Sequence, residues 1–96
     1  MAAAVKTGRV FVHAEKLRGA VDKLLDRTGW SGALAAREIG VGEATMRAWR
    51  IGEVETITRR KTKHKVIGMN RSTLDSFIKC YHTELGTAPV LTIFER

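Results

Sequence analysis

The amino-acid sequence predicts an α+β fold that is mainly helical. Apolar residues recur at spacings of three and four in successive segments between residues 14 and 53, as amphipathic helices require. Short runs rich in β-branched residues flank these segments on both sides and favour strands. With 96 residues, of which 44% are hydrophobic, the chain can form a modest core as one domain spanning residues 1–96.

The first third of the chain predicts an arm, a strand and a helix. Residues 1–8 are small and polar, which is typical of a flexible arm. Residues 9–13, RVFVH, alternate and predict a short strand. Residues 14–28 predict a helix that Gly29 ends, with an apolar stripe of Leu17, Val21, Leu24, Leu25 and Thr28.

Residues 31–53 predict two short helices joined by a tight turn. The first helix carries a stripe of Leu34, Ala35 and Ile39. Gly40 follows at the position where a helix end often adopts the left-handed conformation. Met46 and Trp49 begin a second stripe, so residues 31–53 are expected to form a helix-turn-helix with a basic outer face.

A family resemblance rests on these same 23 residues. Ala36, Gly40, Val41, Met46 and Trp49 are spaced as in the lambda-repressor/Cro superfamily of helix-turn-helix DNA-binding proteins. Thr45, Trp49 and Gly52 resemble the T-x-x-x-W-x-x-G ending of many phage and bacterial repressors. The alternative is a helical hairpin in which Met46 and Trp49 serve only as core.

The resemblance implies that a recognition helix over residues 42–52 enters the major groove of double-stranded DNA. The residues expected to read bases are Glu43, Ala44, Arg47 and Ala48, and Arg47 could bind guanine O6 and N7. Those expected at phosphates are Ser31, Thr45 and Arg50. In the alternative interpretation, Glu43 and Arg47 are an ordinary i,i+4 surface pair.

Residues 54–69 predict a basic β-hairpin, or wing. Strands are expected over residues 54–58 and 65–69, with RRKTKH as the turn between them. The wing tip would carry five cations for the DNA backbone or minor groove, Arg59, Arg60, Lys61, Lys63 and Lys65. The net charge is +7, and residues 44–71 hold eight Lys/Arg against two Glu. A basic block is often only a solvated face, but this one adjoins the expected recognition helix.

The C-terminal part predicts one helix and one strand. Ser72 and Asp75 fit a capping box at the start of a helix over residues 72–85, which Gly86 ends. The apolar face of this helix consists of Leu74, Phe77, Ile78, Tyr81 and Leu85. Residues 89–95 suggest a strand that either mediates a homodimer or packs against residues 9–13.

The composition argues against several other functions. A single cysteine, Cys80, cannot form an internal disulfide, and it is expected to be a small buried hydrophobe. His13, His64 and His82 are far apart in sequence, so we expect no metal site, no cofactor, no small-molecule ligand and no enzyme activity. Without an apolar leader or spanning segment, we expect no membrane and a cytoplasmic location, in a bacterial host if the chain is phage-encoded.

Three functional hypotheses follow. The first is a Cro- or repressor-like transcriptional regulator that binds DNA as a homodimer. The alternative within DNA binding is an excisionase-like architectural protein, because the helix, the wing and the helix after it also resemble that winged family. Gly52 lies seven residues after Thr45, one short of that family's usual spacing. The third hypothesis is a basic protein-binding module that inhibits a host partner.

Overall fold

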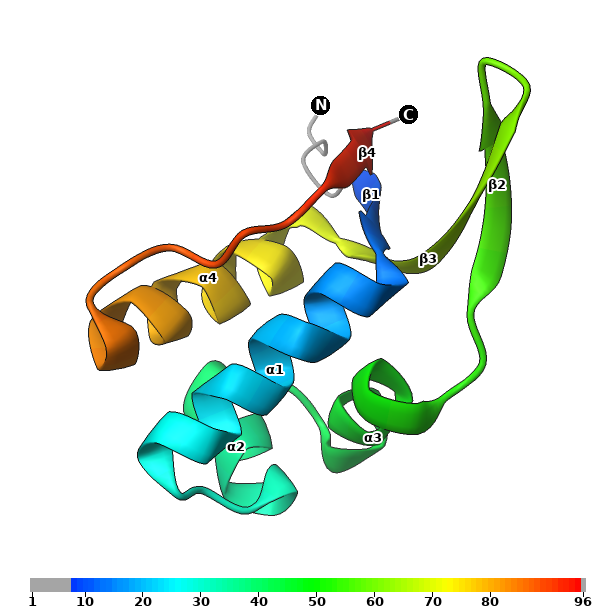
Figure 1. Ribbon diagram of the computed structural model, residues 1–96. Coiled ribbons are helices and arrows are strands. Elements are labelled where there is room, and N and C mark those ends of the chain that lie inside the picture. The colour runs from blue at the N-terminus through cyan, green and yellow to red at the C-terminus, as the bar shows by residue number, and fades with distance from the viewer. Residues whose placement is uncertain (1–7, 96) are drawn as a thin grey trace, which may run out of the picture.

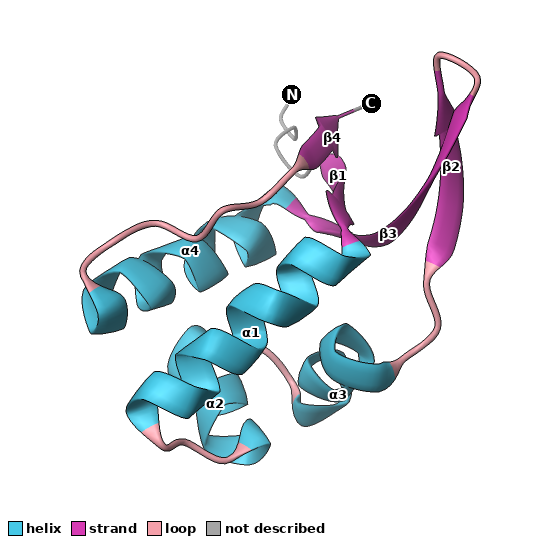
Figure 2. Cartoon of the chain, in the orientation of Figure 1, coloured by secondary structure: helices cyan, strands magenta, loops and turns pink. Residues whose placement is uncertain are grey.

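Four helices and a four-stranded antiparallel sheet make up residues 8–95, the part of the chain that the computed structural model describes (Figures 1 and 2). The predicted class, α+β and mainly helical, is confirmed. The arm predicted over residues 1–8 lies outside the described residues, except for Gly8. In chain order the elements are β1 (Arg9–His13), α1 (Ala14–Thr28), α2 (Gly32–Ile39), α3 (Glu43–Ile51), β2 (Glu55–Arg59), β3 (Thr62–Asn70), α4 (Arg71–Leu85) and β4 (Ile93–Glu95).

The predicted helix ends are confirmed at α1 and α2. α1 stops at Gly29, with φ 76°, and α2 stops at Gly40, with φ 94°. Both values lie in the left-handed region, which costs glycine little and other residues more. The tight turn that Gly40 begins is what allows α3 to start only three residues after α2.

The apolar face of α2 differs in one residue from the prediction. Ala35, Ala36 and Ile39 are buried, whereas Leu34 is 37% exposed, so its assignment to the core stripe was wrong. Successive helical residues are rotated by about 100°, and Leu34 is therefore turned away from the side that Ala35 and Ile39 share. The small side chains at positions 35 and 36 allow α2 to lie close to the core.

The core lies between the helices and one face of the sheet. Its largest fully buried side chains are Trp49, Phe77, Leu17, Leu24 and Met46. Trp49 of α3 meets Phe77 of α4 edge to face, with ring centroids 5.7 Å apart and an interplanar angle of 77°. Such a pair adds about 0.5–1.5 kcal/mol to the free energy gained by burial. α4 therefore supports α3 from inside the molecule.

The strands are ordered β2-β3-β1-β4. Alternation places Val10, Val12, Ile67 and Met69, all buried, on the face that packs against the helices. β3 continues beyond β1 and pairs there with β2 alone, which forms the hairpin that rises beside β1 and β4 in Figure 1.

The hairpin was predicted, but its turn is shorter than expected. The predicted turn RRKTKH contains only two true turn residues, Arg60 and Lys61, and Arg59 pairs with Thr62. The placement of Arg59, Lys63 and Lys65 at the tip was therefore wrong, since these residues lie on the strands. Continued pairing of the two strands satisfies backbone groups that a six-residue loop would leave to water.

The start of α4 and the extent of β4 differ from the prediction, whereas α4 ends at Gly86 as predicted. α4 begins at Arg71, with Asn70 as N-cap, so the expected capping box at Ser72 is absent. Because β3 runs directly into α4, the Arg71 N–H donates to the Gly8 carbonyl, 2.9 Å away. The final strand covers only Ile93–Glu95 and pairs with β1, which confirms the predicted packing against residues 9–13.

Candidate nucleic-acid interface

α3 is fixed to the rest of the molecule along one face. Met46 and Trp49 are 2% and 1% exposed and belong to the core. At the C-terminal end, the Arg18 guanidinium of α1 donates from Nε to the Trp49 carbonyl over 2.8 Å. Its Nη2 also donates to the carbonyls of Ala48 and Gly52. A cation at this end satisfies carbonyls that the helix leaves free and complements the helix dipole.

The opposite face of α3 is open to solvent. Glu43, Ala44, Arg47 and Ala48, the four predicted base-reading residues, are all exposed there. The ion pairs within residues 8–95 are Arg9–Glu55, Arg71–Asp75 and Arg71–Glu95, so Arg47 is not paired with Glu43. The Arg47 guanidinium is thus available to an external acceptor.

Ile51 extends this exposed face, and it was missed in the sequence. Its side chain is 76% exposed although it is large and apolar. Ile51 follows Arg47 by four residues and Glu43 by eight, so the spacing alone could have placed it on the outer face. The outer face of α3 therefore ends in an exposed apolar group.

Gly52 lets the chain turn away closely from the end of α3. A Cβ at this position would lie 2.7 Å from the Cα of Ala48 and 2.8 Å from its carbonyl oxygen. Only glycine avoids this clash, since the obstructing atoms are backbone. The chain then reaches β2 within three residues, which brings the hairpin to the C-terminal end of α3 (Figure 1).

Two of the predicted phosphate-binding residues meet at the start of α2. Ser31 caps this helix, with its Oγ accepting from the Leu34 N–H over 3.1 Å. Arg50 of α3 reaches the same turn, as the space beside Gly32 shows. A Cβ at Gly32 would lie 2.9 Å from Nη1 of Arg50. Gly32, which the sequence did not single out, thus leaves room for the Arg50 guanidinium. Thr45, the third of these residues, is half-buried on α3.

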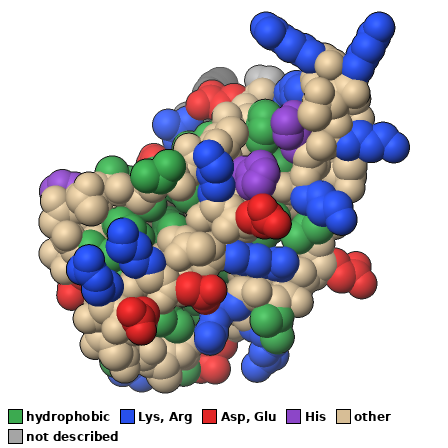
Figure 3. All heavy atoms as spheres, viewed as in Figure 1, with side chains coloured by type: hydrophobic (Ala, Val, Ile, Leu, Met, Phe, Trp, Pro, Cys, Tyr) green, Lys and Arg blue, Asp and Glu red, His purple; other side chains and the backbone are tan. Residues whose placement is uncertain are grey.

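The five cations of the hairpin lie in three places, namely on one face of the strands, in the turn and on the opposite face. Lys63 and Lys65 pair with Thr58 and Thr56 and share one exposed face with them. Arg60 and Lys61 form the turn, and Figure 3 shows Lys and Arg side chains extending from the hairpin at the upper right. Arg59 is half-buried on the other face, and its Nη2 donates to the Glu95 carbonyl over 3.4 Å. Of the five predicted hairpin cations, four are exposed and Arg59 is half-buried.

The remaining titratable groups of note lie away from α3 and the exposed hairpin cations. Hydrogen bonds from Arg71 to Glu95 and to Asp75 raise the pKa of its guanidinium, which stays charged. Burial raises the pKa of the Cys80 thiol, and the nearby carboxylates of Glu84 and Glu38 act in the same direction. Cys80 is half-buried rather than fully buried, and it packs against the edge of the core.

Within residues 8–95, no three His, Cys, Asp or Glu side chains are grouped as a metal site would need. None of the helices in this same range has the length and apolar character to cross a membrane. No family model, curated protein or solved structure matches the chain. Its function is therefore inferred from the arrangement of its own residues.

Proposed function

We propose that the protein is a sequence-specific double-stranded DNA-binding transcriptional regulator of the Cro or repressor kind. The observation that carries the proposal is the exposed outer face of α3, a helix that is anchored to the core by Met46 and Trp49 and that adjoins a basic hairpin. A helix with a fixed orientation and an unpaired arginine on its outer face can be laid into a major groove. The hairpin at its end supplies the cations that attract a phosphate backbone.

Base reading belongs to the outer face of α3. The Arg47 fork can donate two hydrogen bonds to guanine O6 and N7, and Glu43 can accept from cytosine N4. Ala44 and Ala48 allow close approach and offer methyl groups to thymine. Ile51, which is 76% exposed, adds a larger apolar contact at the end of the same face.

Phosphate binding belongs to two places beside α3. Ser31 and Arg50 lie together at the start of α2, where the first N–H groups of a helix favour an anion. Arg60, Lys61, Lys63 and Lys65 would follow the backbone or the minor groove next to the site. Thr45, which is half-buried in the first turn of α3, would contact a phosphate there. Arg59 contributes less directly, since it already contacts Glu95.

An excisionase-like architectural role is the second candidate, and one observation favours it. The hairpin passes directly into α4, as the resemblance to winged proteins with a helix after the wing implies. The two roles differ in the DNA that they need. A homodimeric regulator binds two inverted half-sites about one helical turn apart, whereas an excisionase-like protein binds tandem sites and bends them.

The test is selection of bound sequences from a random duplex library at low and moderate salt. An enriched inverted repeat with half-sites about ten base pairs apart would support a homodimeric regulator acting in the bacterial cytoplasm. Enriched direct repeats would favour the architectural role. Binding without any enriched sequence, or no binding at all, would overturn the proposal and leave a basic protein-binding module as the better hypothesis.

A further inference from the structure

The hairpin is contacted from the far edge of the sheet. The Phe94 ring of β4 lies against the His64 ring of β3, with centroids 4.8 Å apart and planes tilted by 38°. The Arg59 guanidinium of β2 donates to the Glu95 carbonyl of β4 over 3.4 Å. β2 and β4 are the two outermost strands of the sheet, so these contacts do not belong to the ladder of paired strands. The sheet bends until its two edges meet.

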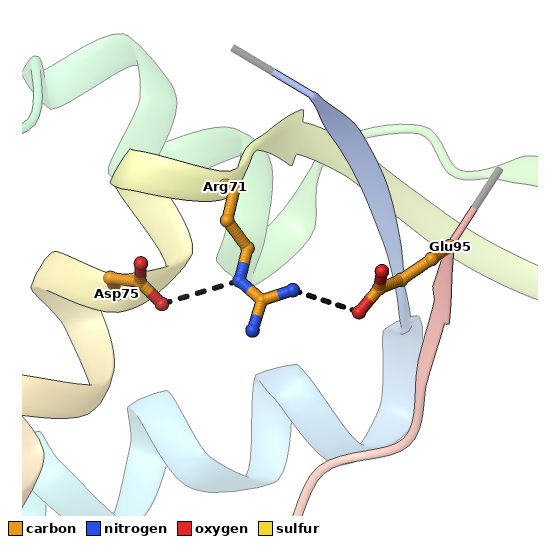
Figure 4. Close-up of polar contacts among 3 residues, drawn as sticks. All are labelled: Arg71, Asp75 and Glu95. Atoms are coloured by element: carbon orange, nitrogen blue, oxygen red, sulfur yellow. Dashed lines mark hydrogen bonds and ion pairs between the residues drawn. The ribbon is translucent and has the colours of Figure 1, made fainter. Parts of the chain in front are cut away.

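β4 is itself fixed to the body of the molecule. It pairs with β1 through Val10↔Glu95, Phe11↔Phe94 and Val12↔Ile93. The Glu95 carboxylate also accepts from Arg71 Nη1 over 2.8 Å, while Arg71 Nε donates to Asp75 over 3.4 Å (Figure 4). Glu95 therefore contacts the first turn of α4 with its side chain and the hairpin with its backbone.

The outer part of the hairpin has little other support. β1 pairs with β3 only as far as Val66, and residues 62–65 of β3 pair with β2 alone. An isolated two-stranded ribbon is at best marginally stable and twists easily. Phe94 and Glu95 meet this ribbon at His64 and Arg59, near the turn and next to its exposed lysines. They are well placed to limit its movement.

We propose that Phe94 and Glu95 are positioning residues of the nucleic-acid interface. By holding the hairpin at a fixed angle to α3, β4 lets the hairpin cations and the recognition helix engage one duplex together. A hairpin that is already oriented loses less conformational entropy on binding than a free one. This inference rests on the proposed DNA-binding function and adds a role for the last strand, which touches neither α3 nor the exposed hairpin cations in the contacts described above.

The experiment measures DNA affinity of the full chain on its selected duplex for four proteins. These are the wild type, Phe94→Ala, the double variant Arg60→Gln/Lys61→Gln, and the triple variant. We expect Phe94→Ala to weaken binding about tenfold and to flatten the salt dependence. We also expect the Arg60→Gln/Lys61→Gln substitutions to reduce DNA affinity by a factor at least about threefold smaller in the Phe94→Ala background than in the wild type. The reason is that the effects of substitutions at interacting sites are not additive. A structural role of Phe94 unrelated to the hairpin would give no such coupling.

Two further variants serve as a negative control and as a second substitution within β4. Val90→Ala removes an apolar side chain that is 80% exposed in the same C-terminal segment, and it should leave affinity unchanged. Glu95→Gln removes the exposed ion pair with Arg71 without disturbing the core, and it should weaken binding in the same direction as Phe94→Ala. If Phe94→Ala does not fold, the cycle is measured with Glu95→Gln in its place.

The outcomes separate this inference from the proposed function. Coupling between β4 and the turn supports the positioning role. Additive effects, with wild-type binding and base preference intact, overturn it and leave DNA binding standing. A wild type that selects no sequence instead refutes the proposed function. Amide order parameters of Lys61 and Lys63 in the free protein test the restraint by itself, since Phe94→Ala should lower them if β4 restrains the hairpin, and unchanged values would overturn the positioning role.

Discussion

Arg47 lies one helical turn from both Glu43 and Ile51 on the exposed face of α3. Its guanidinium takes no part in the ion pairs within residues 8–95. Two further neighbours on this face, Ala44 and Ala48, have small side chains, and Arg47 itself is exposed. At the scale of single residues, sequence preference should therefore depend on Arg47 first.

We predict that Arg47→Ala weakens binding to the selected duplex by about 1–3 kcal/mol and relaxes preference at one base pair. The physical reason is the loss of two hydrogen bonds to a guanine. Equilibrium binding to a set of single-base duplex variants measures it. Lys79→Ala, which removes one positive charge from an exposed position of α4, is the control. An unchanged base preference would mean that α3 does not read the groove.

Ile51 leads to a second prediction at this scale. An exposed isoleucine on a groove-reading helix can bury its side chain against a thymine methyl. Replacing the contacted thymine by uracil should weaken wild-type binding by about 0.8 kcal/mol, the worth of one buried methylene-sized group. Ile51→Ala should bind both duplexes equally. Equal sensitivity of the two proteins to uracil would exclude this contact.

At the scale of elements, α3 depends on a residue of another helix. Arg18 donates to the carbonyls of Ala48, Trp49 and Gly52, which end α3. The helix has nine residues, and helices of this length are unstable alone. Its orientation therefore relies on Trp49 in the core and on Arg18 at the end.

We predict that Arg18→Ala lowers the free energy of unfolding by about 2 kcal/mol, because it leaves three carbonyls without a charged donor. Urea unfolding monitored by circular dichroism measures this loss. Lys23→Ala removes an exposed cation of the same helix and should change the midpoint little. Equal midpoints for the two variants would argue that water replaces Arg18 at no cost.

The hairpin turn is a second element whose contribution to the free energy of unfolding can be tested. Arg60 and Lys61 have φ of 51° and 68°, the left-handed values that two-residue hairpin turns require. Asn-Gly adopts such a turn readily, whereas residues such as Arg and Lys lose about 1 kcal/mol each in the left-handed conformation. Two cations at this position are therefore better explained by a charge that function requires than by turn propensity.

Arg60→Asn with Lys61→Gly should raise the free energy of unfolding by about 1–2 kcal/mol while weakening DNA binding. The slope of log affinity against log salt should become shallower by about two phosphate contacts. The pair Arg60→Gln with Lys61→Gln should flatten this slope equally without the gain in stability. Stabilisation with undiminished binding would show that the turn does not meet DNA.

At the scale of the whole molecule, charge is concentrated on one stretch of chain. Residues 44–71 carry a net charge of +6 out of +7, and they include the hairpin and all of α3 except Glu43. If six phosphates are neutralised, affinity should fall on the order of a thousandfold between about 50 and 200 mM salt. Titrations on one duplex across this range measure it. A weak salt dependence would argue for a partner other than nucleic acid.

The sequence by itself determined which segments are helices, where three of them stop, and most of their buried faces. Gly29, Gly40 and Gly86 end helices as predicted, and the stripes through Leu17, Trp49 and Phe77 are buried. These features depend on residues within one or two turns of each other, so local spacing is sufficient to predict them. The same helical spacing would also have predicted the exposure of Ile51. Whether this face reads DNA stays a prediction.

Only the tertiary structure decided which distant residues support the candidate site. Arg18 and Trp49 are 31 positions apart, and Arg59 and Glu95 are 36 positions apart. No local pattern marks such pairs, because they exist only once α1 crosses α3 and the sheet bends. The pairing of Lys63 with Thr58 and of Lys65 with Thr56 likewise depended on the register between β2 and β3. Spacing along the chain predicts faces, whereas contacts between elements require the folded backbone.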